Sequence, residues 1–127
     1  MENIEIQPTA TTPKISFRPG DGFFEISGKS LPENSYDFFQ PLLEYVEAYA
    51  ENPVESTKVV FRLQYFNTAS TSHFLRIIKK FEKIHAAGKS VEVQWFYDED
   101  DEDMKEAGED FKILLKLPIL IMGTRMD

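Results

Sequence analysis

Apolar and polar residues alternate near the start of the chain, as they do in half-buried β-strands. Residues 14–18 and residues 24–27 both show this alternation. Between them, Pro19-Gly20-Asp21-Gly22 is typical of a turn. We therefore predict a β-hairpin. The opening dozen residues, which end in Thr11-Thr12-Pro13, are expected to form a short strand or a loose arm.

After the hairpin the apolar spacing changes to three or four positions, which is typical of a helix that buries one face. Asn34 or Ser35 can cap the start of this helix, and it should end near Asn52-Pro53. Pro41 lies inside the pattern. Because proline cannot donate the helical hydrogen bond, we expect a kink or an early break there.

Two more segments have helical spacing. The first carries its apolar stripe from Phe74 to His85 and is followed by Gly88, a residue type that commonly ends helices. The second runs through Met104 to Leu115. Residues 58–66 are rich in β-branched and aromatic residues and are predicted to form a buried strand, and residues 91–97 and 119–122 are predicted as two further strands.

This order of elements predicts an α/β fold. Strands that alternate with helices form a mostly parallel sheet with crossover connections. We expect four to five strands, an N-terminal hairpin and about three helices. A length of 127 residues with 42% hydrophobic content indicates one domain, residues 1–127, with a sizeable core.

Composition excludes several classes of function. The chain has no cysteine, so disulfides and thiolate chemistry are absent. Its net charge of −8 argues against binding to nucleic acid, which is a polyanion. The N-terminus does not resemble a signal peptide, and the longest apolar run, residues 117–122, is too short to span a bilayer. We expect a cytoplasmic protein with no membrane partner.

The run of six acidic residues from Asp98 to Asp103 could coordinate a hard cation such as Mg²⁺ or Ca²⁺, but it lacks the glycine and glutamate of an EF-hand loop. The ordinary interpretation is a helix start in which acidic side chains complement the helix dipole. His85, near a helix end, is better explained by the same dipole than as a ligand. We therefore predict neither a metal site nor a cofactor.

A hydrolase is the enzymatic hypothesis that the sequence permits. His73 is close in sequence to several hydroxyl residues, so Ser70 or Ser72 could act with it as a nucleophile. However, no Gly-x-Ser-x-Gly elbow is present, and the hydroxyls are consecutive rather than singled out. We therefore expect His73 to be a helix-surface residue and the protein to have no catalytic residues.

The hydroxyl-rich segment Asn67-Thr68-Ala69-Ser70-Thr71-Ser72 is the most informative motif. It follows a predicted central strand and opens a helix, where free N–H groups favour negative charge. A phosphoryl group on Thr68 would fit there. Alternatively, Asn67, Thr68 or Ser70 simply caps the helix.

Three stretches of the chain, in order and spacing, resemble the SiaC family of bacterial regulatory phosphoproteins. They are Leu31-Pro32-Glu33-Asn34-Ser35-Tyr36-Asp37-Phe38-Phe39, Tyr65-Phe66-Asn67-Thr68-Ala69-Ser70 and Val93-Gln94-Trp95-Phe96-Tyr97-Asp98-Glu99-Asp100. The resemblance covers nearly the whole chain. It implies a STAS-like fold, similar to that of anti-sigma-factor antagonists.

The resemblance also implies a partner-switching cycle in cyclic-di-GMP signalling, which controls biofilm formation. A serine/threonine kinase phosphorylates the position matching Thr68, a PP2C-like phosphatase removes the phosphate, and the unmodified form activates a diguanylate cyclase. Ser70, Thr71 and Ser72 remain alternative acceptors. An anti-sigma-factor antagonist that regulates transcription is the alternative function. The expected partner-binding residues are Asn34, Ser35, Tyr36, Asn67, Thr68, Ser70 and Thr71.

Overall fold

The computed structural model describes residues 1–125, so the last two residues of the predicted domain lie outside the described part. Its elements are β1 (Ile4–Ile6), β2 (Lys14–Arg18), the short 3-10 helix η1 (Pro19–Asp21), β3 (Phe23–Ser30), α1 (Ser35–Tyr49), β4 (Ser56–Phe66), α2 (Thr68–Ala86), β5 (Ser90–Asp98), α3 (Glu102–Leu114) and β6 (Ile119–Thr124). The predicted α/β class is confirmed.

The strands form one mixed sheet in the order β1-β2-β3-β4-β5-β6. The two pairs at the N-terminal side are antiparallel, which confirms the hairpin, and the three remaining pairs are parallel. The sheet has six strands because residues 4–6 pair with β2 as an edge strand. Of the two expectations for the opening residues, the short strand is therefore correct.

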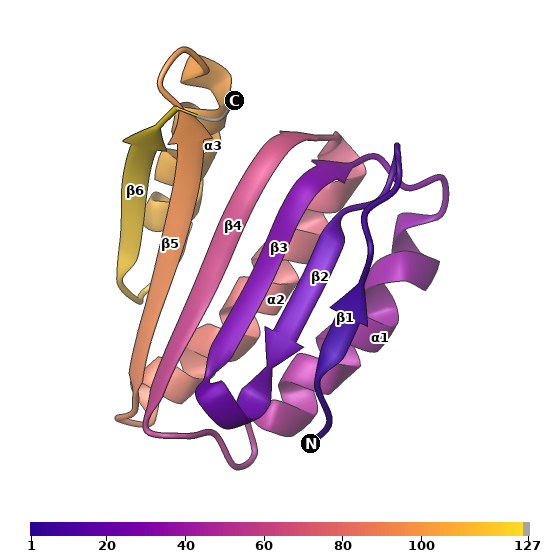
Figure 1. Cartoon of the computed structure of the whole chain (residues 1–127). Helices are drawn as coiled ribbons and strands as arrows, with labels where there is room; N and C mark the ends of the chain where they lie inside the picture. The colour runs from indigo at the N-terminus through magenta and orange to yellow at the C-terminus, as the bar shows by residue number, and fades with distance from the viewer. Residues whose placement is uncertain (126–127) are drawn as a thin grey trace.

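All three helices lie on one face of the sheet, behind the strands in Figure 1. Successive parallel neighbours joined by crossovers of one hand place their helices on the same side. The core between the two layers is rich in aromatic rings. Phe61 contacts both Phe74 of α2 and Trp95 of β5, with ring centroids 5.5 and 5.2 Å apart. Phe24 of β3 contacts Phe81 of α2 at 5.0 Å.

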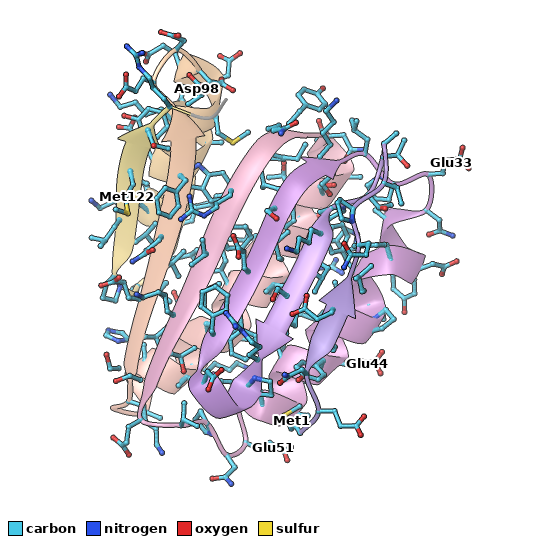
Figure 2. The ribbon with its side chains drawn as sticks, in the orientation of Figure 1. Met1, Glu33, Glu44, Glu51, Asp98 and Met122 are labelled. Carbon is cyan, nitrogen blue, oxygen red and sulfur yellow. The ribbon has the colours of Figure 1, made fainter. Side chains whose placement is uncertain are left out.

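Within residues 1–125, no helix covers the opposite face of the sheet, and its side chains project toward the viewer in Figure 2. Arg62 organises its centre: the guanidinium lies 3.8 Å from the centroid of the Phe96 ring and its Nε lies 3.3 Å from the Glu25 carboxylate. A cation above an aromatic face is attracted by the ring quadrupole. This arrangement partly covers the apolar surface of the open face.

One sequence prediction about the helices is wrong and another is confirmed. α1 runs without interruption through Pro41, so of the expected kink or early break the early break is wrong. Phe39, Leu42 and Val46, on either side of Pro41, are buried in the core. Tertiary burial outweighs the single hydrogen bond that proline removes. At the end of α2, Gly88 has a φ of +102°, which is the left-handed conformation expected of it.

The acidic run joins β5 to α3, as the ordinary interpretation predicted: Asp98 ends the strand and Glu102 begins the helix. Asp101 is the N-cap and its carboxylate accepts a hydrogen bond of 3.0 Å from the Met104 N–H. Within residues 1–125, no cluster of three or more carboxylate or imidazole groups could hold a metal ion. No helix in this part of the chain is long and apolar enough to cross a membrane.

Candidate functional site

The hydroxyl-rich segment lies where β3 and β4 end and α1 and α2 begin. Ser30 and Phe66 are paired in the parallel register, so the two strands end side by side. The N–H of Asn67 then donates to the Ser30 carbonyl at 3.0 Å. This is the carboxyl end of the central parallel strands, where open α/β sheets place their functional loops.

Asn67 is the residue that caps α2, and Thr68 is the first residue of the helix. The Asn67 side-chain oxygen accepts a 2.9 Å hydrogen bond from the Ser70 N–H. Asparagine is among the best N-caps because its oxygen satisfies an amide that has no partner inside the helix. Of the three capping residues that the sequence allowed, the structure thus selects Asn67.

Ser70 is completely buried, with 0% of its surface exposed. Its hydroxyl oxygen lies 2.8 Å from the Asn67 side-chain oxygen, 3.1 Å from the Ser30 carbonyl and 2.8 Å from the Ser30 hydroxyl. One serine proton can serve only one of the first two acceptors, while the Ser30 O–H can donate to Ser70. Ser70 was expected at the partner-binding surface; the structure instead places it inside, as an anchor.

The hydroxyl of Thr68 is exposed and, within residues 1–125, makes no hydrogen bond. The neighbouring hydroxyls are already engaged. Thr71 is half-buried and its hydroxyl lies 3.5 Å from the Asn67 carbonyl, while the exposed Ser72 donates to the Ala69 carbonyl at 3.1 Å. Of the four residues that could accept a phosphate, only Thr68 therefore has a hydroxyl without a hydrogen bond in the described part of the chain.

The start of α1 lies at the same edge of the sheet. Asn34 caps this helix by accepting a 3.1 Å hydrogen bond from the Asp37 N–H, and Ser35 is the first helical residue. Asn34 and Tyr36 are exposed and Ser35 is half-buried. The structure thus brings the two predicted groups of partner-binding residues, around Asn34 and around Thr68, to one end of the molecule.

His73 joins the two helices. Its Nε2 lies 3.2 Å from the Ser35 hydroxyl, and its ring stacks on Phe39 with centroids 5.1 Å apart. Burial of the imidazole and, to a lesser extent, the positive charge of Arg76 lower the pKa of His73 below its ordinary 6.5. His73 was expected on the helix surface, but it is buried because it faces α1.

This geometry does not support a hydrolase at Ser70 or Ser72. A nucleophilic serine needs a histidine within hydrogen-bonding reach and a third group that orients that histidine. Ser70 and Ser72 make their contacts elsewhere, and His73 faces Ser35 instead. Asp37, two residues after Ser35, accepts a hydrogen bond from the Asn34 amide.

Two exposed aromatic residues border the site. Tyr36 is 57% exposed and Tyr65 is 55% exposed, whereas Val59, Val60, Phe61 and Leu63 of β4 are buried. Tyr65 also lines a cavity of about 350 Å³ between the end of β4 and the start of α3. The sequence analysis placed Tyr65 in a buried strand, but the structure leaves its side chain exposed beside the site.

Comparison with known proteins identifies the family. The model of the SiaC family regulatory phosphoproteins matches residues 6–123, which is nearly the whole chain. The chain belongs to the SiaC family. An uncharacterised protein of Pseudomonas aeruginosa strain UCBPP-PA14 is 31% identical over 123 residues, covering 97% of this chain and 98% of that protein.

Solved structures of P. aeruginosa SiaC share the fold. One has a TM-score of 0.88 at 28% identity and covers 98% of this chain and all of the other. SiaC in complex with the diguanylate cyclase SiaD, which it activates, has a TM-score of 0.89 at 30% identity, with 95% and 99% of the two chains covered. This chain is therefore a SiaC family regulatory phosphoprotein, and its homologue SiaC activates a cyclase.

Proposed function

We propose that this chain is a non-enzymatic partner-switch protein controlled by reversible phosphorylation of Thr68. One observation carries the proposal: the first residue of α2 presents an exposed hydroxyl without a hydrogen bond, next to three hydroxyls that are buried or engaged. The family is one of regulatory phosphoproteins.

The helix start can accept a phosphoryl group without unfolding. The amides of the first helical turn and the helix dipole favour negative charge, and a phosphoryl group adds about −1.5 to −2 charges there. The cap from Asn67 to Ser70 does not use the Thr68 side chain. Phosphorylation would therefore change the surface that a partner meets while the fold stays the same.

The proposed switch surface comprises Asn34, Ser35, Tyr36, Asn67, Thr68 and Thr71, to which the structure suggests adding Tyr65. Ser70 is left out because its side chain is inside. In the unmodified state this surface would bind and activate a cytoplasmic diguanylate cyclase, as SiaC is the activator of SiaD. A serine/threonine kinase and a PP2C-like phosphatase would set the phosphorylation state.

Intact-mass spectrometry after incubation with the kinase and ATP tests the site. The wild type should gain one phosphate and Thr68→Ala none. Ser72→Ala is the matched control, because it removes the other exposed hydroxyl of the segment 67–72 and should be modified as the wild type is. Full modification of Thr68→Ala would reject the assignment.

A pull-down with the unmodified chain tests the output. Recovery of a diguanylate cyclase supports the proposed function, and a Thr68→Asp variant should recover less of it. Recovery of a sigma-factor-binding kinase without a cyclase would favour the alternative, an anti-sigma-factor antagonist.

A further inference from the structure

The helical layer carries a striped charge pattern. α2 lies between α1 and α3 in Figure 1. Its sequence contains four lysines and arginines against one acid, Glu82, although the whole chain has a net charge of −8. α1 contains three acids and no lysine or arginine, and α3 contains five acids and two lysines. The middle helix is therefore basic between two acidic neighbours.

Three of the four cations of α2 are available to a partner. Lys80 is paired with Glu47 of α1 at 3.1 Å. Arg76, Lys79 and Lys83 are exposed and form no ion pair within residues 1–125. We call these three residues the α2 cation stripe.

The stripe is continuous with the phosphorylation site. Positions 68, 72, 76, 79 and 83 are three or four residues apart and so lie along one side of a helix. From Thr68 to Lys83 the helix extends about 22 Å. A surface that contacts Thr68 along the axis of α2 would therefore also contact the stripe.

We propose that the α2 cation stripe docks an acidic surface of the protein partner, which under the proposed function is the diguanylate cyclase. The inference rests on that function and adds the chemistry by which the partner is recognised. Complementary charge steers association and fixes the register of docking. The acids of α1 and α3 would repel an acidic surface placed to either side, so the pattern specifies where the partner lies.

The same pattern favours a protein over a nucleic acid. A nucleic acid is bound when clustered cations release many counterions from its phosphates. Here three cations are flanked by acids on both sides, in a chain with a net charge of −8. A protein partner can confine its acids to a narrow stripe, whereas a duplex cannot.

Phosphorylation then has a direct electrostatic effect. A phosphoryl group on Thr68 adds about −1.5 to −2 charges at one end of the stripe, against the three positive charges of Arg76, Lys79 and Lys83. In formal charge it would offset about half or more of the stripe's positive charge, and it would repel the partner's nearest acids. Modification and docking are thus coupled through one helix face.

Activation of a SiaD-like cyclase from the same organism tests the inference. We would compare the wild type with a triple variant, Arg76→Gln, Lys79→Gln and Lys83→Gln. The control variant, Lys58→Gln, Lys112→Gln and Lys116→Gln, removes the same charge from exposed positions outside α2. The first variant should need about tenfold more protein for half-activation, and the control should match the wild type. Raising the ionic strength should weaken the wild type more than the first variant.

A charge-preserving variant, Arg76→Lys, Lys79→Arg and Lys83→Arg, should activate normally, which separates charge from folding. Unchanged activation by the glutamine variant would overturn the inference and leave the proposed function intact. An equal loss in the control variant would also overturn it, as would duplex DNA binding that depends on the stripe while activation does not. Failure of the wild type to activate the cyclase would reject the proposed function and this inference together.

Discussion

The hydroxyl oxygens of Ser30 and Ser70 lie 2.8 Å apart in the interior and join the end of β3 to the first turn of α2 across 40 positions of sequence. Both side chains are fully buried. Buried hydroxyls are stabilising only when their hydrogen bonds are satisfied. This contact fixes the helix start that presents Thr68.

Replacing Ser70 with alanine should therefore destabilise the fold. The change leaves the Ser30 hydroxyl without its Ser70 partner in the core, so the free energy of unfolding should fall by about 1–3 kcal/mol. Urea unfolding measures it. Ser72→Ala is the exposed control and should stay within about 0.5 kcal/mol of the wild type. Equal effects of the two changes would show that the buried contact does not anchor the helix.

Loss of the Asn67 cap should loosen the start of α2. Asn67→Ala removes the side-chain acceptor of the Ser70 N–H and leaves only the Asn67 backbone carbonyl at 3.1 Å, so it should cost about 0.5–2 kcal/mol. Asn67→Ser should cost less because serine also caps. Hydrogen exchange at Ser70 provides the local measurement, with faster exchange expected in the alanine variant. Unchanged protection at this amide would mean that the cap is dispensable.

His73 should make the fold less stable as the pH falls. Its pKa in the folded chain is below the ordinary 6.5. Below about pH 6.5 the unfolded chain gains a proton that the folded chain resists, so the free energy of unfolding decreases, while at higher pH both states are neutral. His73→Phe should lose this part of the pH dependence. Identical pH profiles of the two proteins between neutral and mildly acidic pH would contradict it.

Gly108 should not tolerate a side chain. A Cβ at this position of α3 would lie 2.4 Å from Cδ1 of the buried Trp95, so Gly108→Ala should cost about 1–3 kcal/mol through overpacking. Trp95 is the only tryptophan, so its fluorescence reports the displacement directly. Gly20→Ala is the control, since nothing lies within 4 Å of its added Cβ. A normal emission spectrum and stability for Gly108→Ala would show that α3 can move away without cost.

Most of the fold could be predicted from the sequence because its signals are local. The apolar period located each helix, and the acidic run before Met104 and the glycine at position 88 marked helix ends correctly. Pro41 suggested an early break of α1 because the hydrogen bond that proline removes is a local feature. The burial that stabilises α1 depends on the whole sheet, which the local sequence does not show. The edge strand at residues 4–6 also depends on a partner strand, so its own three residues could not decide it.

The site was predictable in position but not in detail. Asn67 through Ser72 is a run of similar polar residues, and nothing in that run shows which of them faces Ser30, 40 positions earlier. The burial of Ser70 and His73 follows from the packing of α2 against β3 and α1. Their roles therefore required the tertiary structure, and only with it does Thr68 stand out.

The binding of a SiaD-like cyclase to the unmodified and the Thr68-phosphorylated chain tests the central claim most directly. Titration by calorimetry should show binding of the unmodified chain and an affinity at least about tenfold weaker after stoichiometric phosphorylation. Thr68→Val treated with the same kinase should keep the affinity of the unmodified chain. Equal affinity of the two wild-type forms would contradict the switch.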